Sequence, residues 1–169
     1  MKVKIGKFPK GSVDRRIDIE IDRYDTWNLD HTLALIILPA LIQLKQQKHG
    51  VPNDIVSDVG GEDWSSQQCF DFYSDTHAES FDIACKKWDE ILDKMIWSFQ
   101  QIALGDYNDK YHHGEIKIGW TKEDSLGLST MIDENPDEHW YDHVGHMMHE
   151  DRIQEGLELF GKYYRSLWD

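Results

Sequence analysis

The sequence is poor in cysteine and in long apolar runs. Only Cys69 and Cys85 occur in 169 residues, too few for a disulfide framework. The longest apolar run, Leu33 to Ile42, is too short to cross a bilayer and contains Pro39. No signal peptide opens the chain. We therefore expect a soluble protein of a reducing, intracellular compartment with no membrane partner.

The sequence also lacks a basic excess. Its net charge is −14, whereas a protein that binds a nucleic-acid polymer needs a positive stripe facing the phosphates. Residues 1–16 are the exception, since they carry +5 and leave −19 on the remainder. This basic segment can steer a small anion toward an acidic body, or simply keep an edge strand soluble.

Familiar catalytic motifs are missing as well. The sequence has no Walker loop, no Gly-x-Ser-x-Gly elbow and no dinucleotide fingerprint, and neither cysteine lies in a motif that would mark a nucleophile. We therefore assign no catalytic residue, no metal ligand and no cofactor.

The clearest feature present is a helix predicted over residues 25–50. Apolar residues recur at helical spacing on one face and also fill the opposite side, so we expect the helix to be buried nearly all round. Capping candidates are Asp25, Thr26 and Asn28, and Gly50 marks the end. Pro39 should kink it.

Further elements place the chain in the α+β class. Residues 1–22 alternate as a β-hairpin, and helices are predicted over 80–104 and over 137–168, the latter with Pro136 as a plausible first residue. Residues 115–120 are a short strand that can extend the hairpin, and 52–75 is a long loop with a possible helical turn. The prediction is one domain, residues 1–169, of three long helices and a small antiparallel sheet.

A row of histidines suggests a possible metal site. On a helix the spacing gathers them along one side. In zinc proteases a glutamate directly follows the first of the two ligating histidines, but here Val144 follows His143. A solvated or interfacial row that titrates near neutral pH is the favoured interpretation. The row comprises His139, His143, His146 and His149, with Asp142 and Glu150 beside it.

Paired carboxylates suggest an enzyme alternative. Glu90 with Asp93, and Glu155 with Glu158, loosely match the sets with which all-helical nucleotide pyrophosphohydrolases hold magnesium. A charged outer helix face explains the same residues and is favoured.

Aromatic and basic residues gather near helix ends, which is typical of a site for a small nucleotide. Rings can stack on a base, and Lys or Arg can hold a phosphate. For any single ring, packing of a helix onto the core is an equally good explanation. The candidate ligand-binding residues are Tyr24, Trp27 and His31 at the first helix start, Lys45 and Lys48 near its end, and Lys162, Tyr163, Arg165 and Trp168 at the C-terminus.

Three segments carry a family resemblance: DTWNLDHTLALIILPALIQLKQQKHG (25–50), WDEILDKMIWSF (88–99) and LFGKYYRSLWD (159–169). Together they resemble a widespread family of small proteins encoded by tailed bacteriophages. The chain is also similar to phage sponge proteins of the anti-CBASS type, which bind cyclic nucleotide signals of host immunity without cleaving them. The resemblance implies a protein that acts in the host cell cytoplasm, and it assigns no contact residue. A homo-oligomer is expected from the glycine-bearing last helix and the many aromatic residues.

The sequence thus predicts a non-enzymatic protein that sequesters a small anionic nucleotide in pockets at helix ends, between subunits. A metal-dependent nucleotide hydrolase is one alternative. A virion or host-protein adaptor that works through its acidic surface is another.

Overall fold

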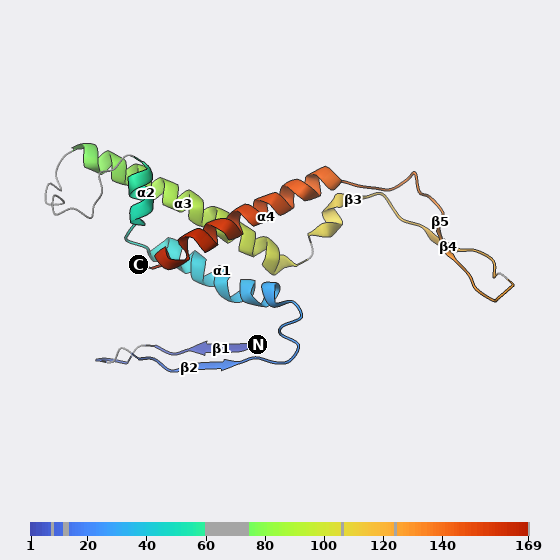
Figure 1. Cartoon of the computed structure of the whole chain (residues 1–169), viewed down its shortest axis with the longest axis horizontal. Coiled ribbons are helices and arrows are strands. Elements are labelled where there is room, and N and C mark those ends of the chain that lie inside the picture. The colour runs from blue at the N-terminus through green and yellow to red at the C-terminus, as the bar shows by residue number, and fades with distance from the viewer. Residues whose placement is uncertain (8, 12–13, 60–74, 106, 124, 169) are drawn as a thin grey trace. The chain divides into compact units, whose positions relative to one another are not determined.

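The computed structural model describes residues 1–7, 9–11, 14–59, 75–105, 107–123 and 125–168, and it confirms the α+β class. The chain divides into two compact units. The helical unit comprises Met1–Gly105 and Glu155–Asp169, and the second unit comprises Asp106–Gln154. The described elements are β1 Lys2–Ile5, β2 Ile17–Glu20, α1 Leu29–Gln47, α2 Asn53–Asp58, α3 Asp75–Leu104, β3 His112–His113, β4 Ile118–Trp120, β5 Met131–Asp133, β6 Trp140–Tyr141 and α4 His143–Tyr163, with 3₁₀ turns at Asn108–Tyr111 and Tyr164–Ser166 (Figure 1).

Helix α1 is shorter and more exposed than predicted. It begins at Leu29 rather than residue 25, because residues 22–28 form hydrogen-bonded turns, and it ends at Gln47. Asn28 precedes the helix but makes no side-chain capping bond. Only Ala34 and Leu41 are buried, so the prediction of a helix buried nearly all round is wrong for the described chain.

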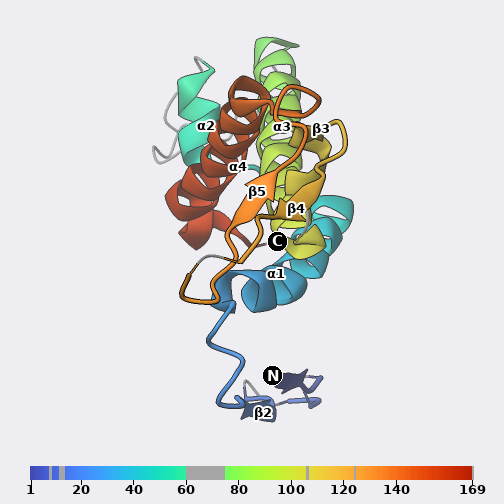
Figure 2. The ribbon, with the colours of Figure 1, turned by 90° about the vertical axis from the view of Figure 1, so that its right-hand side faces the viewer.

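Helix α3 supplies the centre of the core. It begins at Asp75, earlier than the predicted residue 80, and ends before Gly105, whose φ of 73° suits the left-handed turn that closes a helix. Its apolar stripe packs against α1 and α2 and against the last turns of α4 (Figures 1 and 2). The buried members of the stripe are Ala84, Trp88, Ile91, Leu92, Met95 and Phe99.

Helix α4 begins at His143, so the predicted start at residue 137 is wrong. Pro136 lies in a turn closed by the Glu138 amide donating to the Asn135 carbonyl at 3.0 Å. Asp142 instead caps α4, because its Oδ1 accepts from the Gly145 amide at 2.8 Å. The other end also falls short of residue 168, since Tyr164–Ser166 is a 3₁₀ turn.

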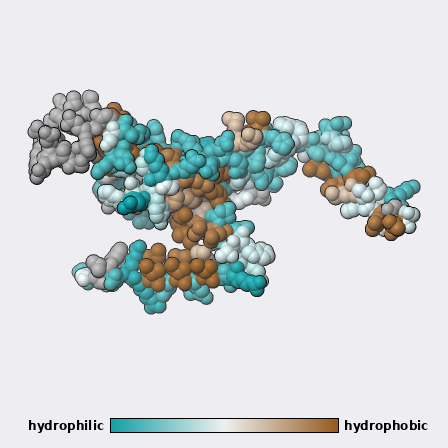
Figure 3. Space-filling model, viewed as in Figure 1, coloured by the Kyte–Doolittle hydropathy of each residue, from teal (hydrophilic) through white to brown (hydrophobic). Residues whose placement is uncertain are grey.

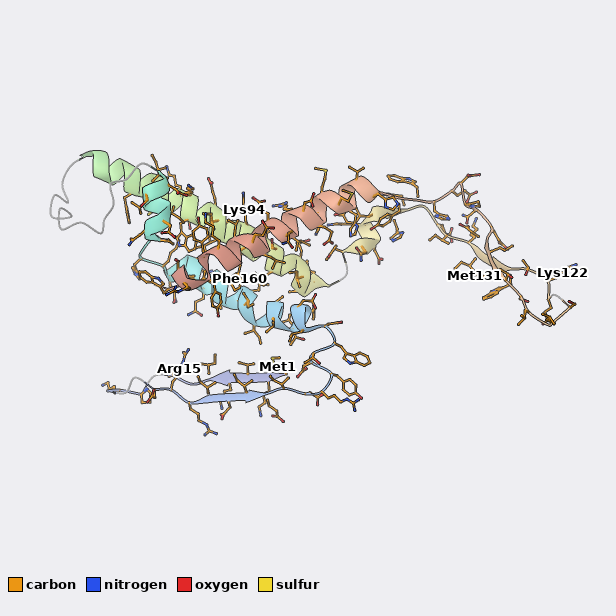
Figure 4. The ribbon with its side chains drawn as sticks, in the orientation of Figure 1. Met1, Arg15, Lys94, Lys122, Met131 and Phe160 are labelled. Carbon is orange, nitrogen blue, oxygen red and sulfur yellow. The ribbon has the colours of Figure 1, made fainter. Side chains whose placement is uncertain are left out.

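Glycine allows α4 to approach α3 closely. A Cβ on Gly156 would clash with the Ser98 hydroxyl and lie 2.6 Å from the Lys94 carbonyl oxygen. Nearby, the rings of Phe99 and Phe160 meet edge to face with centroids 4.9 Å apart, and Figure 4 labels Phe160 and Lys94 on the two helices. The backbones of α3 and α4 therefore approach closely at Gly156.

The described strands form three separate two-stranded antiparallel sheets instead of the single small sheet that was predicted. β1 pairs with β2 as predicted, with Val3 opposite Ile19. The segment expected to extend that hairpin pairs elsewhere: β4 joins β5, and Trp120 lies opposite Met131. β3 pairs with β6.

The predicted long loop contains one short helix, α2, which buries Ile55 and Val56. Residues 60–74 of the predicted loop, Trp64 and Cys69 among them, lie outside the described part of the chain. None of the described helices combines the length and the apolar character needed to span a membrane.

Candidate functional site

Two predicted ligand-binding rings form an exposed pair just before α1. The centroids of Tyr24 and Trp27 lie 5.5 Å apart with the planes at 83°, and the side chains are 62% and 80% exposed. The Trp27 amide donates to the Tyr24 carbonyl at 3.2 Å, so the turn itself sets the spacing. The Arg23 guanidinium lies 5.9 Å from the centre of the Tyr24 ring. Sequence reasoning missed Arg23, although its position next to Tyr24 was a signal.

Asp25 fastens this aromatic turn. Its Oδ1 lies 2.5 Å from the α-amino group of Met1, and its Oδ2 accepts from the Asp22 amide at 2.6 Å. The hydrogen bond from the amino group, followed by that from Asp22, lowers the pKa of Asp25 below its usual range. The carboxylate therefore stays charged and joins the start of β1 to the turn.

His31 faces the end of α3. Its Nδ1 lies 3.1 Å from the Ile102 carbonyl oxygen, and its ring lies against Gly105. Because a carbonyl only accepts, Nδ1 carries the proton and donates. The contact satisfies one of the carbonyls left over at a helix C-terminus. His31 thus has a structural role next to the aromatic pair.

The two lysines predicted to hold phosphate already contact carboxylates of α3. Lys45 Nζ lies 2.5 Å from Asp93 Oδ1, and Lys48 Nζ lies 2.9 Å from Asp89 Oδ1. An anionic ligand here would share these ammonium groups with the carboxylates.

The C-terminal candidates divide into buried and exposed groups. Tyr163 is 2% exposed and meets Trp88 edge to face at 5.5 Å, so its ring packs in the core and presents no free face. Lys162 Nζ lies 4.9 Å from the centre of the Tyr163 ring, and a hydrogen bond with Tyr163 raises the pKa of Lys162, aided by Asp58 and Asp54. Arg165 and Trp168 are exposed.

The candidates therefore form two sets. Tyr24, Trp27 and His31 lie at the start of α1. At its other end, Lys48 contacts Asp89 of α3, and Tyr163 contacts the neighbouring Trp88. Nineteen helical residues rise about 28 Å, so the start and the end of α1 are too far apart for one small nucleotide to touch both on a single chain.

The second unit contains a cluster of tyrosine and histidine rings. His149 is buried and stacks on Tyr107 with centroids 4.7 Å apart, and its Nδ1 lies 2.6 Å from Lys110 Nζ. Because an ammonium only donates, Nδ1 accepts and the proton of the neutral ring is on Nε2. Burial first, and then the charge of Lys110, lowers the pKa of His149 below its usual value. The Tyr107 hydroxyl donates to Glu150 at 2.7 Å.

The histidines do not form the single helical row that was predicted. His139 lies before α4, and its Nε2 meets Asp133 Oδ2 at 2.5 Å, a contact that lowers the pKa of Asp133. Among the described residues, no group of three or more His, Cys, Asp or Glu side chains is arranged to hold a metal ion.

One member of each carboxylate set of the hydrolase alternative contacts a lysine. Asp93 pairs with Lys45, and Glu155 Oε1 lies 2.5 Å from Lys94 Nζ. These contacts fit the charged outer helix face that the sequence favoured. A comparison with protein-family models, with curated proteins and with solved structures finds no match to the chain.

Proposed function

We propose that this protein binds and sequesters a small anionic nucleotide without cleaving it, as a phage immune-evasion protein of the host cell cytoplasm. The observation that carries the proposal is the exposed pair Tyr24 and Trp27 with Arg23 beside it. The sequence resemblance to phage sponge proteins supplies the biological setting, and cyclic nucleotides are the ligand class that it suggests.

The chemistry of the aromatic turn supports a base with an attached phosphate. An aromatic side chain contributes on the order of 1–3 kcal/mol by stacking on one base. Covering a ring that is 80% exposed also removes apolar surface from water. The Arg23 guanidinium can form paired hydrogen bonds with phosphate oxygens, and Asp25 holds the turn in place before a ligand arrives.

The second set of candidates supports sites shared between copies of the chain. Lys45 and Lys48, at the other end of α1, lie beyond the reach of a nucleotide bound at Trp27 of the same chain. In a homo-oligomer, the aromatic turn of one copy can face the basic residues of another, so each site would take its rings and its cations from different subunits.

A thermal-shift panel of cyclic dinucleotides, cyclic trinucleotides and ADP-ribose cyclisation products tests the proposal. A ligand at a hundredfold excess over its dissociation constant stabilises the folded protein by about 2.7 kcal/mol, so at least one compound should raise the melting temperature. Trp27→Ala should abolish the shift. Trp120→Ala, which removes an equally large exposed ring from the second unit, should keep it.

Chromatography of the mixture after heat denaturation separates storage from turnover. With magnesium, manganese or zinc present, the added nucleotide should be recovered intact. New products would favour the hydrolase alternative. A panel without any shift, together with co-purification of a host or capsid protein, would favour the adaptor alternative.

A further inference from the structure

We propose that the β1–β2 hairpin is an arm that packs its apolar face onto the exposed side of α1 in a second copy of this chain. The inference rests on exposed apolar surface and on charge, and it does not depend on nucleotide binding.

The arm has one apolar face. The register Lys2↔Glu20, Val3↔Ile19, Lys4↔Asp18 and Ile5↔Ile17 places charged residues on one side and aliphatic residues on the other. Ile5, Ile17, Ile19 and Ile21 are 50–59% exposed, and Figure 3 shows a run of apolar surface along the hairpin. A two-stranded hairpin is marginally stable in water by itself, so this face requires a cover.

Helix α1 has the complementary surface. Its buried side, with Ala34 and Leu41, packs against α3, yet the opposite side is also apolar. Residues 33–42 include no charged side chain in ten positions. A helix that is apolar all round is normally buried, and here one side is still open. The large side chains on it are Leu29, Leu33, Leu35, Ile36 and Ile42, which are 37–54% exposed.

The connection between the arm and α1 favours exchange with another copy. The turns at residues 22–28 are closed by hydrogen bonds from the Asp25 amide to the Asp22 carbonyl and from the Trp27 amide to the Tyr24 carbonyl. The Met1 amino group is bonded to the Asp25 carboxylate. Within the described chain both apolar faces stay exposed although they are joined by this short, hydrogen-bonded connector. In a dimer, the arm of each copy can cover the open side of α1 in the other copy, and this reciprocal contact closes the assembly with twofold symmetry.

The charge of the arm also favours a second copy of this chain as its partner. Residues 1–20, which include both strands of the arm, carry +3 and the remainder of the chain carries −17, so an arm is attracted to the acidic body of another copy. A neutral lipid surface or an unrelated basic protein offers no negative charge to attract the arm. A second copy of this chain supplies an aliphatic surface and a negative field together.

Analytical ultracentrifugation over a range of concentrations, without nucleotide, tests the arm. The wild-type protein should sediment at twice the 19.9 kDa chain mass. Ile19→Asp on the arm and Leu35→Asp on α1 should each sediment as one chain with unchanged helical circular dichroism. Asp18→Asn, on the charged face of the same strand, is the matched control and should leave the mass unchanged.

Mixing the two variants makes the test specific. A pair of Ile19→Asp and Leu35→Asp chains keeps one intact contact, between the wild-type arm of one and the wild-type α1 of the other. The mixture should therefore recover part of the double mass that neither variant shows alone. A wild-type mass of one chain, an assembly that survives either variant, or a mixture without recovery overturns the proposal. Loss of the nucleotide-induced thermal shift would leave it intact.

Discussion

The helical unit and the second unit treat their large apolar side chains in opposite ways. The helical unit buries a continuous cluster around Trp88, Leu92 and Met95. Of the apolar side chains described in the second unit, only Tyr111 and Ile153 are buried, while Trp120, Leu126 and Trp140 are at least 60% exposed. The second unit relies instead on polar bonds and ring stacks, such as those of Asn135 and His149. One unit is held by burial and the other by specific contacts.

The largest expected effect tests burial directly. Trp88→Ala should lower the free energy of unfolding by about 3–5 kcal/mol, because Trp88 of α3 is 2% exposed and its ring packs against Tyr163. Trp120→Ala should change it by less than about 0.5 kcal/mol, because that ring is 67% exposed. Urea unfolding of both variants measures the difference. Equal losses would contradict the contrast between the units.

A pair of glycines in the part of α4 that belongs to the helical unit tests how closely that unit is packed. Gly156→Ala should destabilise by up to about 3 kcal/mol, because the new methyl group meets the Ser98 side chain and the Lys94 backbone. At Gly161 a Cβ meets nothing within 4 Å. Gly161→Ala should therefore stabilise by up to about 1 kcal/mol through helix propensity. Thermal unfolding should move the two melting temperatures in opposite directions, and a parallel change would refute the close contact.

The contrast also explains what the sequence could predict. Periodicity finds helices that bury a stripe, so α3 was predicted from the spacing of its apolar residues alone. Boundaries failed where local hydrogen bonds compete with the helix, as in the turns before Leu29 and at Asp142. Strands of two or three residues, such as β3 and β5, have too few alternations to give a signal.

In the candidate site, too, the sequence predicted contacts between neighbouring residues and missed contacts between distant ones. Tyr24 and Trp27 are three residues apart, so a turn brings them together without long-range information. The burial of Tyr163 depends on Trp88, and the pairing of Lys48 depends on Asp89, both of them distant in sequence. Composition showed which residue types were present, but the contacts of distant helices decide which of them are accessible to a ligand.

Asn135 offers a way to weaken the second unit alone. Its buried side chain accepts from the Lys117 amide at 2.8 Å and donates to the Glu115 carbonyl at 2.6 Å. Asn135→Ala leaves both backbone groups without this partner, at a cost of about 1–3 kcal/mol. Hydrogen exchange should accelerate around β4 and β5 while amides of α3 stay protected. Equal acceleration in α3 would show that the two units unfold together.

Asn135→Asp is the matched variant. It keeps the oxygen that accepts from Lys117 but loses the amide that donates to Glu115 and to Glu138 Oε2, which lies 3.0 Å away. It also places a second carboxylate beside Glu138. We expect exchange in β4 and β5 to accelerate with Asp as well, since the donor is lost and like charges approach.

The smallest expected effect is a pH dependence confined to the second unit. Burial lowers the pKa of His149 in the folded chain, with Lys110, His146 and Arg152 acting in the same direction and Glu150 opposing them. The unfolded chain keeps a pKa of about 6.5 for this ring. Between the two values the unfolded chain binds more protons, so stability present above about pH 6.5 is lost as the pH falls toward the folded pKa.

Hydrogen exchange of the second unit between about pH 7 and pH 5, corrected for intrinsic rates, measures that loss. His149→Phe keeps a ring against Tyr107 without a titrating group, so it should remove the pH-dependent part of the protection. His112→Gln, at an exposed position in the same unit, should retain it. If His149→Phe keeps the wild-type pH dependence, another group titrates. The effect is small because one imidazole contributes it, whereas the helical unit draws its stability from many buried side chains that do not titrate.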